Sequence, residues 1–129
     1  MATATKTVTI IVASAANTAG ATTRGTVDLR TALGGIVTYK ITNGATSPTV
    51  QAVANLLVAH NIGATPVSAS AGVDWKTVYQ VGNGIVANTI TEWSYTFGPE
   101  VMHLEVEFTG NTGQSVTVEA AVSIFASIA

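Results

Sequence analysis

Turn signals recur along this chain at short spacings, and they limit the fold more than any other feature. They lie at Ala19-Gly20, Gly34-Gly35, Asn43-Gly44, Asn61-Ile62-Gly63, Gly82-Asn83-Gly84, Phe97-Gly98-Pro99 and Gly110-Asn111-Thr112-Gly113. The chain holds 21 threonines and 17 valines but only five leucines. β-Branched side chains suit a pleated sheet, and short strands between regular turns are typical of sandwiches and barrels. We therefore predict an all-β fold, a single antiparallel β-sandwich.

The clearest predicted strand covers residues 102–109. Its apolar residues alternate with polar ones, so one face carries Met102, Leu104, Val106 and Phe108, and the other carries His103, Glu105, Glu107 and Thr109. Residues 116–125 alternate in the same way after the turn at 110–113, and we expect the two segments to form a hairpin. Further strands are predicted at residues 7–12, 36–42, 75–81 and 89–97.

Residues 48–60 fit two templates. Ser47-Pro48 followed by apolar residues at helical spacing matches a capped amphipathic helix with proline at its first position. The strand template also fits, because one face would carry the alternate residues Val50, Ala52, Ala54, Leu56 and Val58. In an otherwise all-β chain, we favour the strand.

Charge is scarce in this sequence. The 129 residues include five basic and seven acidic ones, net charge −2, with 47% hydrophobic residues and a mean hydropathy of +0.43. We expect one domain over residues 1–129. So few cations disfavour nucleic-acid binding, and no apolar run approaches the ~20 residues that cross a bilayer. A charge-poor surface promotes association, so we expect a homo-oligomer.

The N-terminal segment is Ala/Thr-rich, and residues 1–7 are a candidate N-terminal arm. Ala13-Ser14-Ala15 has the small-x-small form of a signal cleavage site, but the β-branched run before it reads better as a strand. Exposed sheet edges offer unpaired N–H and C=O groups. We expect residues 1–12 to pair with, or lie across, a neighbouring chain.

His103, Glu105 and Glu107 are the sharpest candidates for chemistry. Alternation places all three on one strand face, where two carboxylates and an imidazole are suitable ligands for a divalent cation. The same pattern is typical of the solvated face of an edge or outer strand. We favour the solvated face and predict no metal site.

Catalytic patterns are weak. His60 or His103 with Asp28 or Asp74 could nominally serve a Ser-His-Asp triad, but no serine lies in a Gly-x-Ser-x-Gly elbow. Gly82-Asn83-Gly84 lacks the third glycine of a dinucleotide fingerprint and reads as a turn. There is no cysteine to act as a nucleophile or zinc ligand. We predict no catalytic residues, no cofactor and no enzymatic activity.

Aromatic residues gather in two predicted strands. Trp75 and Tyr79 share one face of the first, and Trp93, Tyr95 and Phe97 share one face of the second. Such a set could stack on sugars, but aromatic residues at alternate positions are more often sandwich core or subunit contact. We favour core or contact.

Several short segments together resemble a known family. They are Asp28-Leu29-Arg30, residues 34–44 with their Thr-Asn-Gly end, Ser47-Pro48-Thr49, Asp74-Trp75, and residues 98–102 followed by the turn at 110–113. Over residues 26–122 the chain resembles small virion structural proteins of tailed bacteriophages, of the capsid decoration or cement type. The resemblance implies a jelly-roll-like β-sandwich, and makes residues 48–60 a strand. It carries over no functional residues.

The function that this resemblance implies is mechanical. It points to a homotrimer that binds the major capsid protein on the phage capsid surface and stabilises the head shell, after synthesis in the bacterial host cytoplasm. The alternatives are a phage tail, collar or head-fibre component, and a carbohydrate-binding β-sandwich module that uses Trp75, Trp93 or Tyr95. A small hydrolase is a more distant alternative.

Overall fold

A computed structural model describes residues 3–60 and 75–128 of the chain, and within them it is all-β. The described residues contain no helix, and so none that could span a membrane. Eight strands follow one another: β1 (Thr3–Asn17), β2 (Thr23–Asp28), β3 (Gly34–Asn43), β4 (Val53–Ala59), β5 (Lys76–Gly82), β6 (Ile90–Phe97), β7 (His103–Thr109) and β8 (Val116–Ile128). The prediction of an all-β chain is confirmed.

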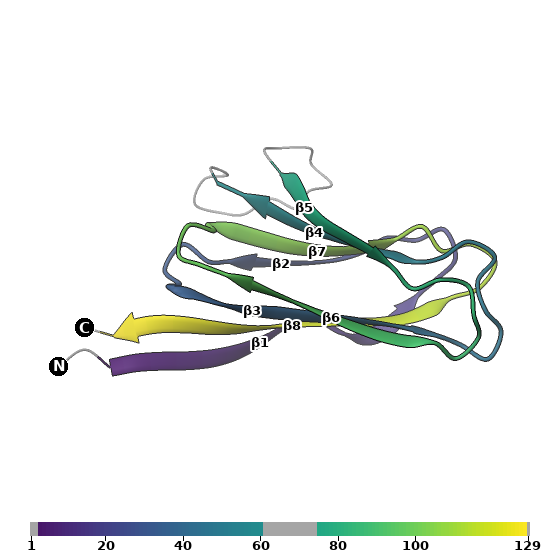
Figure 1. Cartoon of the computed structure of the whole chain (residues 1–129), viewed down its shortest axis with the longest axis horizontal. Helices are drawn as coiled ribbons and strands as arrows, with labels where there is room; N and C mark the ends of the chain where they lie inside the picture. The colour runs from purple at the N-terminus through teal and green to yellow at the C-terminus, as the bar shows by residue number, and fades with distance from the viewer. Residues whose placement is uncertain (1–2, 61–74, 129) are drawn as a thin grey trace.

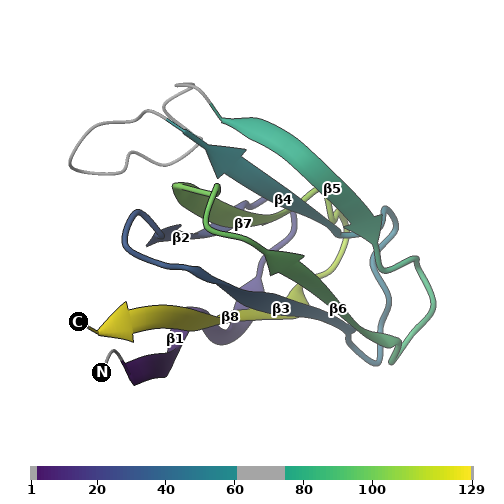
Figure 2. The ribbon, with the colours of Figure 1, turned by 60° about the vertical axis from the view of Figure 1, so that its left-hand side comes forward.

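The strands form two antiparallel four-stranded sheets packed face to face (Figure 1). The first sheet has the order β1-β8-β3-β6 and the second has the order β2-β7-β4-β5. The first strand pairs with the eighth, the second with the seventh, the third with the sixth and the fourth with the fifth. This is a long hairpin rolled up around its own middle, which is the jelly-roll arrangement. Figure 2 shows the two layers from a second side.

The turn at residues 110–113 does not form the expected hairpin. β7 lies in the second sheet and β8 lies in the first, so the turn crosses from one layer to the other. Alternation predicts correctly which side chains of these two strands point inward. It does not require the two strands to lie in the same sheet, because side chains from two separate sheets can point into one core. The hairpin prediction is therefore wrong, while both strands are confirmed.

The ambiguous segment at residues 48–60 is a strand in part: Val53–Ala59 form β4, and residues 48–52 before it make only an isolated bridge, from Val50 to Thr112. β4 lies between β7 and β5 and hydrogen bonds to both, for example through Leu56, which is opposite Val106 and Tyr79. Leu56 and Ala54 are fully buried. Pairing on both edges satisfies more backbone groups than an isolated helix on this sandwich would, so tertiary context overrides the local helical spacing.

The core fills the space between the two sheets. Tyr39 lies at its centre, 1% exposed, and its ring stacks on Trp93 with centroids 5.9 Å apart. Burial raises the pKa of Tyr39 to about 12. The other large core side chains come from four strands and one loop: Leu29, Val37, Ile41, Leu56, Leu104, Val106, Phe108, Val118 and Val122.

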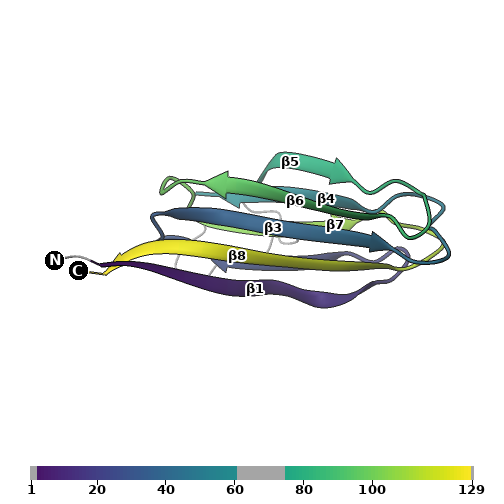
Figure 3. The ribbon, with the colours of Figure 1, turned by 60° about the horizontal axis from the view of Figure 1, so that its bottom comes forward.

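The N-terminal segment belongs to the chain's own sheet. β1 lies alongside β8 (Figure 3) and pairs with it from Thr3 opposite Ile128 to Asn17 opposite Val116. Val12 on β1 is part of the core. The structure thus corrects one expectation: residues 3–7 belong to a strand of the domain rather than to an arm, and they pair with β8 of the same chain. The other edge of β1 has no partner strand among the described residues, so pairing of residues 1–12 with a neighbouring chain stays a prediction.

Four buried asparagines brace the loops at the end of the sandwich opposite the chain termini. Asn17 donates through Nδ2 to Asn111 Oδ1 at 2.7 Å, and Asn111 donates back to the Asn17 carbonyl at 3.0 Å. Asn83 donates through Nδ2 to Asn43 Oδ1 at 3.0 Å, and Asn43 donates to the Val86 carbonyl at 2.9 Å. A loop that crosses between the sheets has no neighbouring strand to hydrogen bond with. The asparagine amides supply the hydrogen bonds in its place.

Candidate functional surfaces

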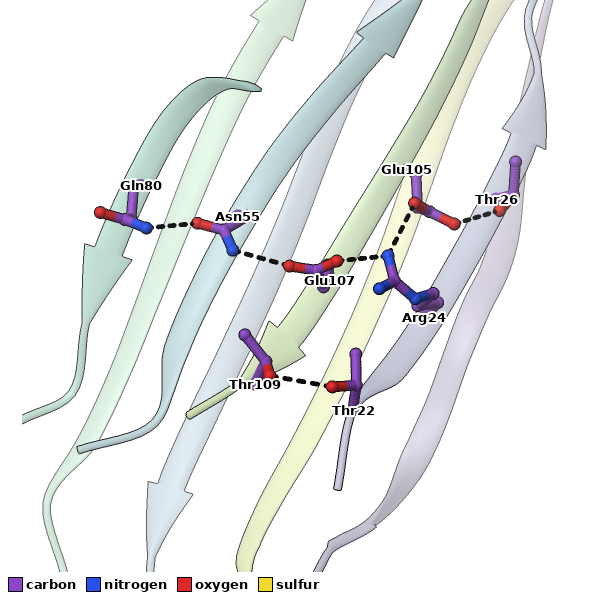
Figure 4. Close-up of polar contacts among 8 residues, drawn as sticks. All are labelled: Thr22, Arg24, Thr26, Asn55, Gln80, Glu105, Glu107 and Thr109. Atoms are coloured by element: carbon purple, nitrogen blue, oxygen red, sulfur yellow. Dashed lines mark hydrogen bonds and ion pairs between the residues drawn. The ribbon is translucent and has the colours of Figure 1, made fainter. Parts of the chain in front are cut away.

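A row of polar side chains crosses the outer face of the second sheet (Figure 4). Arg24 on β2 reaches over β7, where its Nη1 lies 3.4 Å from Glu105 Oε2 and also contacts Glu107. Thr26 donates through its hydroxyl to Glu105 Oε1 at 2.9 Å. The guanidinium therefore lies between two carboxylates of one strand.

The row continues across the remaining strands. Asn55 on β4 donates through Nδ2 to Glu107 Oε1 at 2.8 Å, and Gln80 on β5 donates through Nε2 to Asn55 Oδ1 at 2.7 Å. The Thr22 and Thr109 hydroxyls are 2.9 Å apart beside it. Side-chain bonds thus join all four strands of this sheet, parallel to the backbone ladder.

His103, Glu105 and Glu107 do share one face, but that face is not the solvated edge that we predicted. β7 is a central strand between β2 and β4, and His103 and Glu105 are 1% and 0% exposed. A buried carboxylate needs a charged or hydrogen-bonding partner, and Arg24 and Thr26 supply it. Among the described residues, no group of three or more His, Asp or Glu is arranged to hold a metal ion.

Among the residues that the structure describes, His103 is the triad candidate that lies near a carboxylate. Its Nδ1 lies 3.8 Å from Asp28 Oδ1, beyond hydrogen-bond distance, while Asp28 is held by Arg30 through contacts as short as 2.6 Å. That ion pair lowers the pKa of Asp28 to about 2. His60 is exposed at the end of β4, and Asp74 lies outside the described residues. No described contact joins a serine hydroxyl to His103.

Acidification is expected to destabilise the fold through His103. Burial lowers the pKa of His103 below 6.5, and the Asp28 carboxylate opposes this only in part. The folded state therefore prefers the neutral imidazole, so its contribution to stability is complete above pH 6.5 and is lost as pH falls through the lowered value. The free energy of unfolding should fall from pH 7.5 to pH 5.5 with a slope of at most about 1.4 kcal/mol per pH unit.

Urea denaturation of the His103→Gln variant at the same two pH values checks this prediction. The variant should lose most of the pH dependence, whereas His60→Gln, which removes an exposed imidazole, should keep it. Equal slopes in wild type and His103→Gln would refute the assignment. The contribution of the Asp28 carboxylate to the free energy of unfolding is lost only below pH 3.8, towards pH 2. It therefore does not change between pH 7.5 and pH 5.5.

The aromatic residues divide between core and surface. Phe97 is 4% exposed, and Trp93 and Tyr95 pack against the core from β6. This confirms the core interpretation for that strand and removes Trp93 and Tyr95 from any sugar-stacking platform. On β5, Tyr79 is 46% exposed, while Trp75 just before the strand is partly buried.

The outer face of the first sheet is apolar and nearly uncharged. Lys6 lies near one end of it, and Lys40 lies towards the other end, 2.9 Å from Glu119 and 4.0 Å from Glu92. These four are the only charged residues in β1, β3, β6 and β8. Between them lie Val8, Ile10, Ile36, Thr38, Ala121, Ser123 and Phe125, which we call the apolar face; Val8 and Ile10 are 67% and 62% exposed.

Two depressions indent this face. One, of about 330 Å³, lies where β1 bulges away from β8 after Ile10, and it is lined by Ala13, Ala121 and the Lys40 and Glu119 side chains among others. The second, of about 350 Å³, lies at the other end beside Lys6 and Phe125. Both are shallow and carry no cluster of catalytic groups.

Sequence reasoning missed the apolar face and the role of Arg24. Val8, Ser123 and Ile36 become neighbours in one row only through the β1–β8 and β8–β3 registers, which local patterns do not reveal. Arg24 belongs to no sequence motif that would have indicated its role. One signal was available in the sequence. Val8 and Ile10 alternate with threonines, which indicates that β1 carries apolar side chains on its outer face as well as towards the core.

Comparisons with known proteins support the fold. No protein-family model and no curated protein sequence matches the chain. Among solved structures, the chain is similar to a chain in the structure of infectious bursal disease virus Gx strain, with a TM-score of 0.55 and 11% sequence identity. The similarity covers 95% of this chain and 32% of the viral chain. A chain of the T13 IBDV viral particle gives a TM-score of 0.53 with 7% identity, over 95% and 31%.

A bacterial protein shares the same fold. The K3 cleaved adhesin domain of Lys-gingipain from Porphyromonas gingivalis gives a TM-score of 0.51 with 9% identity, over 80% of this chain and 63% of that one. The present chain spans about a third of the length of the viral chains. At these identities the likeness shows the fold alone, a β-sandwich that virus particles and an adhesin both contain.

Proposed function

We propose that this chain is a structural subunit of a virus particle, most specifically a bacteriophage capsid decoration or cement protein. The observation that carries the proposal is a jelly roll whose first sheet turns a nearly uncharged, apolar face to the outside. Isolated soluble domains rarely expose such a face unless a partner covers it. The fold likeness to chains of a viral particle and the resemblance of residues 26–122 to phage virion proteins support the same function.

The mechanism that we propose is mechanical. Copies associate with one another, as a homotrimer in this proposal, and with the major capsid protein, and each contact removes apolar surface from water. Symmetry repeats a modest contact many times over a shell, so the sum resists internal pressure even where one contact is weak. The proposal gives the chain no catalytic residue, cofactor or metal, and it places the protein on the capsid surface.

The structure offers one observation for a carbohydrate-binding alternative. Tyr79 is exposed on β5, with Trp75 close to it in sequence, and the fold is shared with an adhesin domain. A glycan array tests this alternative directly. Binding that Tyr79→Ala abolishes would favour the carbohydrate-binding module over the shell subunit.

The copy number of the protein in purified particles tests the main proposal. A decoration protein should be present in amounts comparable to the major capsid protein, and particle images should show its density on the capsid axes. A tail, collar or head-fibre component should be present in a few copies per particle and lie at one vertex. Absence of the chain from particles made by its source would overturn the proposal.

A further inference from the structure

We propose that two copies of this chain pair through their apolar faces about a two-fold axis that lies in the interface, perpendicular to the strands. Such a contact is isologous, since both copies use the same surface. It concerns the chain itself and does not depend on the proposed role in a particle. The argument rests on how the register orders the outer side chains into rows.

Four successive rows cross the first sheet. The first contains Lys6 and Phe125; the second contains Val8, Ser123, Ile36 and Thr96; the third contains Ile10, Ala121, Thr38 and Ser94; the fourth contains Glu119, Lys40 and Glu92. A two-fold axis between the second and third rows reverses their order in the partner. The uncharged second row of each copy then covers the uncharged third row of the other, with Val8 over Ile10 at the β1 end and hydroxyl side chains at the β6 end.

The same operation brings opposite charges together. It places Lys6 of one copy, on β1, over the β1 end of the partner's fourth row, one strand away from Glu119 on β8. Because the axis repeats the contact, two such pairs flank the apolar centre. Rotation about an axis parallel to the strands would instead place Glu119 over the partner's Lys40. Opposite charges therefore meet in both arrangements, and shape selects between them.

Shape agrees with charge in this arrangement. Phe125, which is 37% exposed in the first row, comes to lie over the fourth row of the partner. The 330 Å³ depression beside the β1 bulge lies there, between Ala13, Ala121 and Glu119. An exposed aromatic ring on one copy therefore meets a hollow with largely apolar walls on the other, and sheets packed in this way lie about 10 Å apart.

The available area sets the strength of the pair. Four strands spaced by ~4.8 Å, with about eight residues each at ~3.4 Å, give roughly 500 Å² per copy, or roughly 1,000 Å² in total. That is the lower limit for a specific interface, so the pair should form with a Kd of about micromolar or weaker. A chain that also formed a three-fold contact through another surface would assemble as a hexamer.

Sedimentation equilibrium over a range of concentrations tests the pair. The wild-type mass should double, from one chain of 13.1 kDa to two, or from a trimer to a hexamer. Ala121→Arg puts two like charges close to the axis and should weaken the doubling at least about ten-fold. Lys76→Glu, on exposed β5 of the other sheet, is the matched charge control and should leave it unchanged.

A charge exchange tests the arrangement itself. Lys6→Glu and Glu119→Lys should each weaken the pair, and the double variant should recover it to within about three-fold of wild type, because both contacts are restored with reversed sign. Thermal melts establish that each variant is folded. The proposal is overturned if the wild-type mass never doubles up to about 1 mM, if folded Ala121→Arg pairs like wild type, or if the double variant pairs no better than the singles.

Discussion

Replacing Arg24 with methionine is expected to lower the free energy of unfolding by about 3–5 kcal/mol. The guanidinium contacts both Glu105, which is fully buried, and Glu107, which is largely buried. Methionine keeps much of the side-chain length but leaves the two carboxylates facing each other without the cation. A buried charge that loses its partner costs far more than an exposed ion pair is worth. Urea denaturation should show the loss as a lower midpoint.

Two further variants separate this charge effect from a packing effect. The triple variant Arg24→Met, Glu105→Gln, Glu107→Gln removes all three charges and should be more stable than Arg24→Met alone. Lys40→Met breaks a more exposed ion pair and should cost no more than about 1 kcal/mol. A single variant as stable as wild type would show that Arg24 does not stabilise Glu105.

Replacing Gly35 with alanine is expected to destabilise the protein by about 3 kcal/mol or more, at the upper end of the range for overpacking. An added Cβ would lie 2.1 Å from the carbonyl oxygen of Ser123 and 2.8 Å from the Phe97 ring. Gly35 pairs with β8 on one side and β6 on the other, so the backbone cannot move away from one strand without approaching the other. Relief of the clash requires broken ladder hydrogen bonds.

Gly44→Ala is the matched control for this substitution. Its added Cβ would meet only the Thr46 carbonyl oxygen, at the ordinary distance of 3.8 Å. The control should stay within about 0.5 kcal/mol of wild type, while Gly35→Ala should melt about 10 °C lower. Similar melting temperatures for the two variants would contradict the close approach of β8 at Gly35.

The local patterns predicted the inward faces of β7 and β8, and the reason is physical. Leu104, Val106 and Phe108 are fully buried because alternation with a period of two fixes which side chains share a face. The same period says nothing about which strand lies alongside. Residues 110–113 therefore looked like a hairpin turn although they join two sheets, and that connection depends on pairings between strands far apart in the sequence.

The outer faces were harder to predict than the core. An alternating His-x-Glu-x-Glu face reads as solvated, yet a basic residue from a remote strand can cover it, as Arg24 does over Glu105. On the first sheet, exposed residues such as Val8 and Ile36 form one surface only after the register is known. Scarcity of charge predicts that some surface is buried between molecules, but composition does not say where on the fold that surface lies.

The pairing of β1 with β8 delays folding during protein synthesis. Roughly 100 residues separate the two strands, so a ribosome working at about 5–20 residues per second needs roughly 5–20 s to make β8 after β1 has emerged. Through that interval β1 lacks its partner, so its backbone edge and its core residue Val12 stay uncovered. An unpaired edge of this kind is open to pairing with neighbouring nascent chains on the same message.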